Sequence, residues 1–234
     1  MGAYGGTFDP IHNGHVEIAC AIIKNFGLDA LLIVPAAVPP HKDADSVSGS
    51  YHRYAMAVMA TLDIPGATVS TMEIERPDRP YTYETIERLR AFYGEQASLF
   101  FIVGSDSFEE IHTWREPMRV LTRANLIVAA RPGYEMANPR LLEIAAGKSA
   151  SADTAGHQSR VETPVDMVDL RGSTGPASLD RNHGRSSIFL TDYVRRDISS
   201  TEIRRRTGEG LTIRDLVPEP VARYIDKYEL YRRT

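Results

Sequence analysis

The sequence predicts an α/β fold: a Rossmann-like, doubly wound parallel sheet followed by a small C-terminal helical segment. The first observation is that apolar runs of strand length alternate with amphipathic stretches of helical length along most of the chain. Such alternation implies parallel strands joined by right-handed helical crossovers. The second observation is that the runs at 99–103 and 126–130 are entirely apolar, which is typical of strands buried on both faces of a parallel sheet.

The predicted elements follow one another in a regular order. We expect strands within residues 1–6, 30–36, 68–74, 98–104, 125–131 and 187–193. We expect helices within residues 14–27, 51–62, 82–94, 199–206 and 218–231. The first strand is unusually short, and hydrophobic periodicity alone does not reveal it.

The first predicted helix carries an apolar stripe and a clear stop signal. Gly27 follows the last apolar residue and is the expected C-cap, because glycine adopts the left-handed conformation at helix ends. Cys20 is the sole cysteine, so no intrachain disulfide can form, and we interpret it as a core residue rather than a reactive thiol. At helical spacing the buried stripe is predicted to consist of Val16, Ala19, Cys20, Ile23 and Phe26.

The length allows one α/β domain or two small ones, and we expect a single domain spanning residues 1–234; 42% hydrophobic and 25% charged residues are ordinary for a globular protein. A net charge of −4 argues against a broad nucleic-acid surface. No apolar run approaches the roughly 20 residues that span a bilayer, and no signal peptide is evident. We therefore expect a cytoplasmic protein without a membrane or nucleic-acid partner, and a homo-oligomer stays open.

Residues 147–187 differ in composition from the rest of the chain. They are rich in Gly, Ser, Asp, Thr and Pro, which is typical of a loop. We expect an inserted, mobile loop here, with a short strand in "PVDMVDL" at residues 164–170.

The stretch "GGTFDPIHNGH", residues 5–15, concentrates unusual residues between the first strand and the first helix. Gly5 and Gly6 let the backbone approach a ligand closely, and a helix N-terminus offers N–H groups to phosphate. His12 and His15, three residues apart, are expected on one side, where they can donate hydrogen bonds to oxygens that gain charge. The alternative is that each histidine is only a helix cap or surface residue, and the GxGxxG fingerprint is absent.

This stretch resembles the HxGH signature of the nucleotidyltransferases and closely matches the bacterial nicotinate-nucleotide adenylyltransferases. Six further segments are similar to that family and occur in its order. They are spread along most of the chain apart from the insert: "VPPHK" (38–42), "RPYTYETIERL" (79–89), "FIVGSDSFEEIHTW" (101–114), "ARPG" (130–133), "ISSTEIR" (198–204) and "VPEPVARYIDKYELY" (217–231).

The resemblance implies an enzyme that transfers AMP from ATP to nicotinate mononucleotide, yielding deamido-NAD and pyrophosphate in NAD biosynthesis. The acceptor phosphate would attack the α-phosphorus in line, without a general base or a covalent intermediate. Catalysis would then rest on positioning and on stabilisation of charge. Magnesium would be carried by the ATP phosphates, and no Cys/His or carboxylate cluster suggests a metal held by the protein.

On the ATP side, the resemblance assigns His15 and His12 as the catalytic pair. The hydroxyl residues at 199–201 and the acidic residue Asp106, which belong to the ATP-binding set below, could instead be ordinary helix N-caps. Arg204 could lie on a solvated face together with its two arginine neighbours. The ATP-binding residues implied by the resemblance are Gly5, Gly6, Thr7, Phe8, Asp106, Ser199, Ser200, Thr201 and Arg204.

On the acceptor side, the resemblance implies aromatic, hydroxyl and cationic contacts. Trp114 would stack on the pyridine ring, with a core position as the alternative, and Arg131 could instead form a structural ion pair. The acceptor-binding residues implied are Lys42, Tyr83, Thr85, Trp114 and Arg131. An adenylyltransferase for nicotinamide mononucleotide or phosphopantetheine, and a non-catalytic nucleotide-sensing module, are the alternatives.

Overall fold

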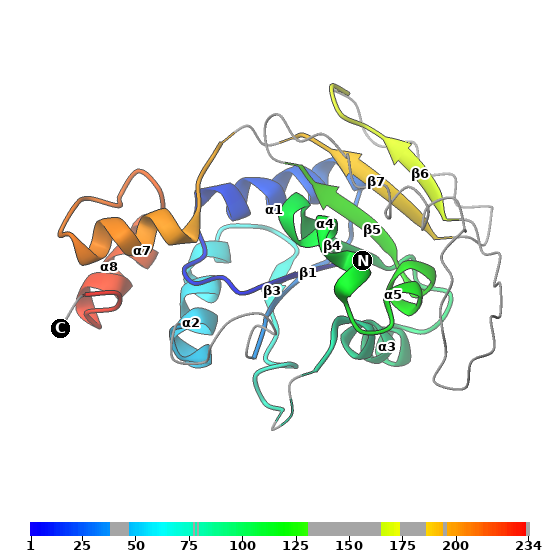
Figure 1. Cartoon of the computed structure of the whole chain (residues 1–234), viewed down its shortest axis with the longest axis horizontal. Coiled ribbons are helices and arrows are strands. Elements are labelled where there is room, and N and C mark those ends of the chain that lie inside the picture. The colour runs from blue at the N-terminus through cyan, green and yellow to red at the C-terminus, as the bar shows by residue number, and fades with distance from the viewer. Residues whose placement is uncertain are drawn as a thin grey trace. The chain divides into compact units, whose positions relative to one another are not determined.

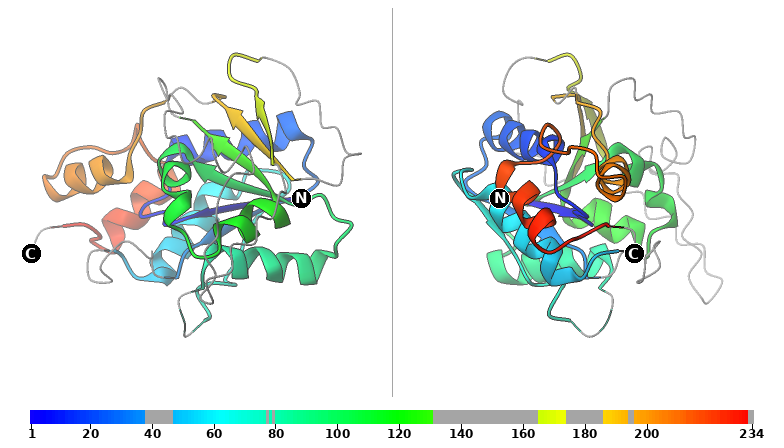
Figure 2. Two further views of the ribbon diagram at one scale, coloured as in Figure 1. Left: turned by 45° about the vertical axis from the view of Figure 1, so that its right-hand side comes forward. Right: turned by 90° about the vertical axis from the view of Figure 1, so that its left-hand side faces the viewer.

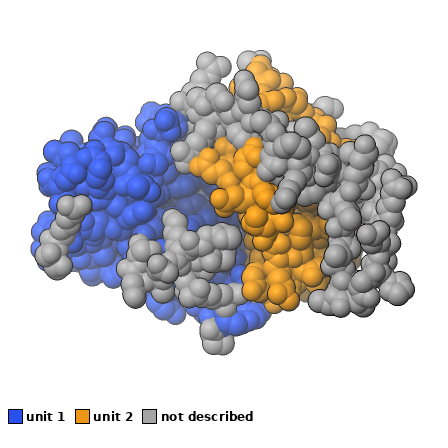
Figure 3. Space-filling model, viewed as in Figure 1, with its two compact units in different colours: residues 1–80, 194–234 blue, residues 81–193 orange. Residues whose placement is uncertain are grey.

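The computed structural model describes residues 1–37, 47–76, 78, 80–130, 165–173, 186–193 and 196–232. Seven strands form one sheet in the order β3-β2-β1-β4-β5-β7-β6 (Figure 1). This is the order of a doubly wound α/β sheet, so the predicted fold class is confirmed. The chain divides into two compact units, Met1–Pro80 with Val194–Thr234, and Tyr81–Tyr193 (Figure 3).

The first unit contains the sheet strands β3, β2 and β1, all parallel. The last two residues of β1, Gly5 and Gly6, pair with Val34 and Pro35 of β2, so the strand ends where the "TFDPIHNGH" segment begins. Helix α8 packs against α2 (Figure 1). The elements are β1 (Gly2–Gly6), α1 (Asn13–Phe26), β2 (Leu31–Pro35), α2 (Ser50–Thr61), β3 (Ala67–Val69), α7 (Ser200–Gly208) and α8 (Glu219–Lys227).

The second unit contains the parallel strands β4, β5, β7 and β6, and β5 and β7 run side by side (Figure 2). Ile102 of β4 and Ile127 of β5 have no exposed surface, which confirms two strands buried on both faces. The elements are α3 (Thr82–Tyr93), β4 (Phe100–Gly104), α4 (Ser105–Glu109), a 3₁₀ turn (Ile111–Thr113), α5 (Pro117–Arg123), β5 (Asn125–Ala129), β6 (Asp166–Asp169) and β7 (Ser187–Thr191).

The buried face of α1 differs from the predicted stripe. Its buried residues are Gly14, Ala19, Ile22 and Phe26, while Cys20 is exposed. The prediction that Cys20 is a core residue is therefore wrong. The cause is that apolar residues occupy every position from 18 to 23, so two neighbouring stripes fit the helical period equally well and tertiary contacts select one of them.

Two strand predictions also change. The strand expected over 68–74 ends at Val69, because Ser70 begins a turn in which its Oγ accepts a hydrogen bond from the Met72 backbone N–H. The short strand expected within 164–170 is confirmed as β6. Most of the segment 147–187 lies outside the described residues. Across the parts of the chain that the structure describes, no helix combines the length and apolar character needed to span a bilayer.

The end of α1 yields a test of the capping prediction. Gly27 has φ = +56° and ψ = +47°, with its N–H bonded to the Ile23 carbonyl. A Cβ there would meet no atom within 4 Å, so only backbone strain opposes a side chain. We expect Gly27→Ala to lower the free energy of unfolding by about 1 kcal/mol, measured by urea denaturation. Gly27→Asn should lose less, because asparagine tolerates this conformation, and equal losses would contradict the capping explanation.

Candidate active site

The two histidines of the HxGH stretch meet at the start of α1, as predicted. His12 is the N-cap residue, and His15 lies three residues further on. Their rings stack with centroids 3.7 Å apart and planes inclined by 26°. The backbone N–H of His12 donates a hydrogen bond to Nδ1 of His15 at 3.2 Å. Because Nδ1 is an acceptor, the neutral His15 ring carries its proton on Nε2.

The Phe8 side chain packs against this histidine pair. Its ring packs edge-on to His15, with centroids 5.1 Å apart, and to Tyr4 at 5.4 Å. The residue is 2% exposed and adopts φ = +51°. A Cβ on Gly6 would lie 2.8 Å from the Phe8 ring. The glycine at position 6 is therefore required by the Phe8 ring, a reason that the sequence did not suggest.

The start of α7 meets the same segment from far along the chain. The Ser200 hydroxyl donates to the Pro10 carbonyl at 3.0 Å. Nη1 of Arg204 donates to the Asp9 carbonyl at 2.8 Å, and Nη2 donates to the Thr201 hydroxyl at 3.3 Å. These contacts bring the ATP-side residues of positions 5–15 and 199–204 together within the first unit.

The capping alternative applies to only one of these hydroxyl residues. Ser199 is the N-cap of α7, and its Oγ accepts a hydrogen bond from the Glu202 N–H at 3.2 Å. Ser200 and Thr201 lie inside the helix, and their hydroxyl groups bond elsewhere. The two arginine neighbours of Arg204, Arg205 and Arg206, pair with Glu202 on the surface.

Arg53 of α2 is a functional candidate that the sequence analysis missed. The residue is 1% exposed, and its guanidinium donates to three backbone carbonyls: Thr7 and Ala37 at 2.8 Å, and Ser48 at 2.9 Å. Burial lowers the pKa of Arg53, and the charge of Asp9 opposes that shift. The signal was its spacing, because Arg53 shares a helical face with the buried Met56, Ala57 and Ala60.

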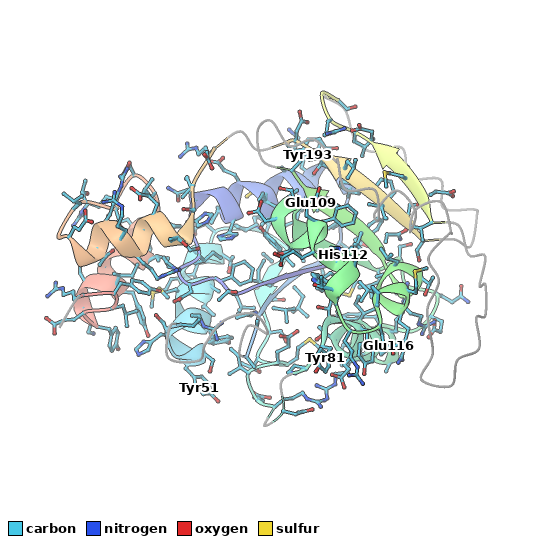
Figure 4. The ribbon with its side chains drawn as sticks, in the orientation of Figure 1. Tyr51, Tyr81, Glu109, His112, Glu116 and Tyr193 are labelled. Carbon is cyan, nitrogen blue, oxygen red and sulfur yellow. The ribbon has the colours of Figure 1, made fainter. Side chains whose placement is uncertain are left out.

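In the second unit, Asp106 stands in the first turn of α4, whose N-cap is Gly104. The N-cap alternative for Asp106 is therefore wrong, although a carboxylate in a first turn still interacts favourably with the helix dipole. Beyond this turn, the backbone carbonyl of Glu109 lies 3.0 Å from Nδ1 of His112. Figure 4 labels both residues.

Three acceptor-side residues also lie in the second unit. Thr85 of α3 is 1% exposed. Tyr83 stacks on Tyr81 with centroids 6.2 Å apart, and the Arg119 guanidinium lies 4.6 Å from the Tyr83 ring centroid. Trp114 follows the 3₁₀ turn and is partly exposed, so it is not a core residue.

Lys42 and Arg131, the remaining predicted contacts, lie outside the described residues. In the described parts of the chain, no group of three or more His, Cys, Asp or Glu side chains is arranged to hold a metal ion.

Comparison with known proteins agrees with this geometry. The cytidylyltransferase-like family model matches residues 3–206. A probable nicotinate-nucleotide adenylyltransferase from Thermoanaerobacter sp. (strain X514) is 36% identical over 100% of this chain and 94% of its own. A second probable nicotinate-nucleotide adenylyltransferase, from Pectobacterium atrosepticum, is 37% identical over 98% of this chain and 97% of its own.

A solved structure shares the fold at low sequence identity. The Plasmodium falciparum nicotinic acid mononucleotide adenylyltransferase, complexed with NaAD, superposes with a TM-score of 0.67 at 18% identity. The match covers 98% of this chain and 96% of that one. Together with the full-length relatives, these findings show that the chain belongs to the cytidylyltransferase-like family and, within it, to the nicotinate-nucleotide adenylyltransferases.

Proposed function

We propose that this protein transfers the AMP group of ATP to nicotinate mononucleotide, releasing pyrophosphate and forming deamido-NAD. The observation that carries the proposal is the stacked His12–His15 pair at the start of α1. A helix N-terminus with an imidazole N–H donor is suited to bind a polyphosphate. The relatives that match the full length of the chain carry names for the same reaction.

In the reaction that we propose, an oxygen of the acceptor phosphate attacks the α-phosphorus of ATP. The bond from that phosphorus to the bridging oxygen breaks, and the electron pair leaves with pyrophosphate. No general base is required, because the acceptor phosphate is already ionised at neutral pH. His15, with its proton on Nε2, stabilises charge that develops on the phosphate oxygens. Good alignment of the two substrates supplies about 7–11 kcal/mol of the barrier reduction.

The hydroxyl and cationic groups of α7 would bind the same triphosphate. Ser199, Ser200 and Thr201 form the start of this helix, and Arg204 lies one turn on. Thr7 and the backbone of Gly6 and Phe8 would line the other side of the phosphate site. This arrangement supports ATP rather than an uncharged ligand, because N–H groups and a guanidinium favour anions.

For the acceptor, we propose that the start of α3 and the Trp114 ring bind nicotinate mononucleotide. A helix N-terminus favours a carboxylate over an amide, and an indole ring offers a flat face for the pyridine. Asp106 is assigned to the adenosine. Lys42 and Arg131 complete the set as phosphate cations. Magnesium would arrive with ATP, supplying positive charge to the phosphates.

Acceptor choice is tested by comparing nicotinate mononucleotide, nicotinamide mononucleotide and phosphopantetheine at equal ATP. We expect kcat/KM to favour the nicotinate form by about tenfold or more, because a helix N-terminus stabilises its carboxylate. Pyrophosphate release is the measurement. Equal use of the amide would contradict the proposed specificity, and ATP binding without turnover on any acceptor would favour a nucleotide-sensing module.

Removing the His15 side chain should affect chemistry more than binding. We expect His15→Ala to lower kcat by about 10²–10³-fold, with a smaller change in the dissociation constant for ATP. Steady-state assays of pyrophosphate release measure kcat, and calorimetry measures the dissociation constant for ATP. His15→Gln is the matched variant, because its amide reaches the position of Nε2, and it should retain more activity than His15→Asn. A similar kcat for the alanine variant and the wild type would refute the role.

The proposed stacking role of Trp114 predicts a selective effect on the acceptor. Trp114→Ala should raise the KM for nicotinate mononucleotide about tenfold or more, because a base stacked on an aromatic ring contributes about 1–3 kcal/mol. Trp114→Phe keeps an aromatic face and should lose less. The KM for ATP serves as the internal control, and an equal rise in both KM values would point to general disruption instead.

A further inference from the structure

The segment that follows α8 folds back and reaches the loop between β1 and α1. The Tyr231 hydroxyl donates a hydrogen bond to Oδ1 of Asp9 at 2.7 Å, across 222 positions of sequence. The turn is closed by the Leu230 N–H, which donates to the Ile225 carbonyl at 3.1 Å. Glu229 and Tyr231 adopt φ = +51° and +64°. Two non-glycine residues in this conformation persist only where surrounding contacts enforce it.

Asp9 is the point where this contact meets the proposed ATP site. Its side chain is 1% exposed, and Nη1 of Arg204 lies 3.9 Å from Oδ2. The same Nη1 donates to the Asp9 backbone carbonyl at 2.8 Å. The Ser48 N–H donates to Oδ2 at 3.4 Å. Asp9 therefore bonds Tyr231 on one carboxylate oxygen and faces the Arg204 cation with the other.

The protonation state of the Tyr231 phenol favours its hydrogen bond to Asp9. Burial and the charge of Asp9 both raise the pKa of Tyr231, so the phenol stays protonated and remains a donor at neutral pH. A buried carboxylate that lost this donor would be poorly solvated. It would then compete for other donors, and among the described residues Arg204 brings a cationic nitrogen to 3.9 Å from Oδ2.

We propose that Tyr231 is a positioning residue for ATP, which acts by fixing the Asp9 carboxylate and, through it, the Arg204 guanidinium. The inference rests on the proposed function, since it needs Arg204 to bind the triphosphate. An arginine that is already held by a carboxylate, a carbonyl and the Thr201 hydroxyl loses less side-chain freedom when it binds phosphate. Pre-organisation of this kind strengthens binding without adding a contact to the ligand.

The primary test compares Tyr231→Phe with Tyr228→Phe. Tyr228 lies three residues earlier, is 49% exposed and contacts His52 rather than Asp9, which makes it the matched control. We expect Tyr231→Phe to raise both the KM for ATP and the dissociation constant of α,β-methylene-ATP about tenfold, with little change in the KM for the acceptor. Tyr228→Phe should leave both ATP quantities unchanged.

A double-mutant cycle separates positioning from a general structural role. In an Arg204→Ala background, Tyr231→Phe should weaken binding of the ATP analogue by much less than in the wild type, because residues that act through one another are not additive. Equal losses in the two backgrounds, or a lower melting temperature with unchanged ATP affinity, would overturn the proposal. Asp9→Asn is the second variant, and it should also weaken ATP binding because it removes the charge that faces Arg204.

The binding measurement distinguishes this inference from the proposed function. The analogue binds without an acceptor, so coupling between Tyr231 and Arg204 in a protein that transfers no AMP would support the inference while refuting the proposed reaction. AMP transfer by the wild type, without coupling between Tyr231 and Arg204, would support the proposed reaction and refute the inference. A wild-type protein that failed to bind the analogue would overturn both.

Discussion

Two guanidinium groups hold the backbone carbonyls of the loop that leads into the HxGH helix, and the geometry of the proposed phosphate site depends on this restraint. Arg53 donates to the Thr7 carbonyl at 2.8 Å, and Arg204 donates to the Asp9 carbonyl at the same distance. These side chains come from α2 and α7, so tertiary contacts as well as local turn geometry fix the loop. Any displacement of these carbonyls would move His12 and therefore the ring stacked on it.

The buried Arg53 also shapes the electrostatics of this loop. An apolar residue of similar volume would leave three partly buried carbonyls without their donor, and an unmade hydrogen bond of a fully buried group costs about 1–3 kcal/mol. Within a low-dielectric interior the cation also acts over a longer distance than it would in water. Its charge lies next to a segment that we propose to bind a triphosphate, and the charge of Asp9 opposes the lowering of the Arg53 pKa that burial causes. One side chain therefore contributes to both the shape and the potential of the loop.

Short sequence patterns predicted the features of the fold that local interactions determine. The alternation of strands and helices, the Gly27 cap and the convergence of His12 and His15 follow from short stretches of sequence, and each is confirmed. The buried stripe of α1 could not be predicted, because contacts with neighbouring elements decide which of its two apolar faces is buried. The contact from Tyr231 to Asp9 joins residues 222 positions apart, and only the fold brings them together.

The acceptor side shows how contacts within the protein divide the roles of aromatic residues. One face of Tyr83 is covered by the Arg119 guanidinium, which also forms an ion pair with Glu87 at 3.1 Å. A ring committed to a cation–π contact orders its neighbours and presents less surface to a ligand. Trp114 is partly exposed at the end of a 3₁₀ turn. We therefore propose Trp114 for stacking on the pyridine ring, while the contact between Tyr83 and Arg119 links α3 to α5.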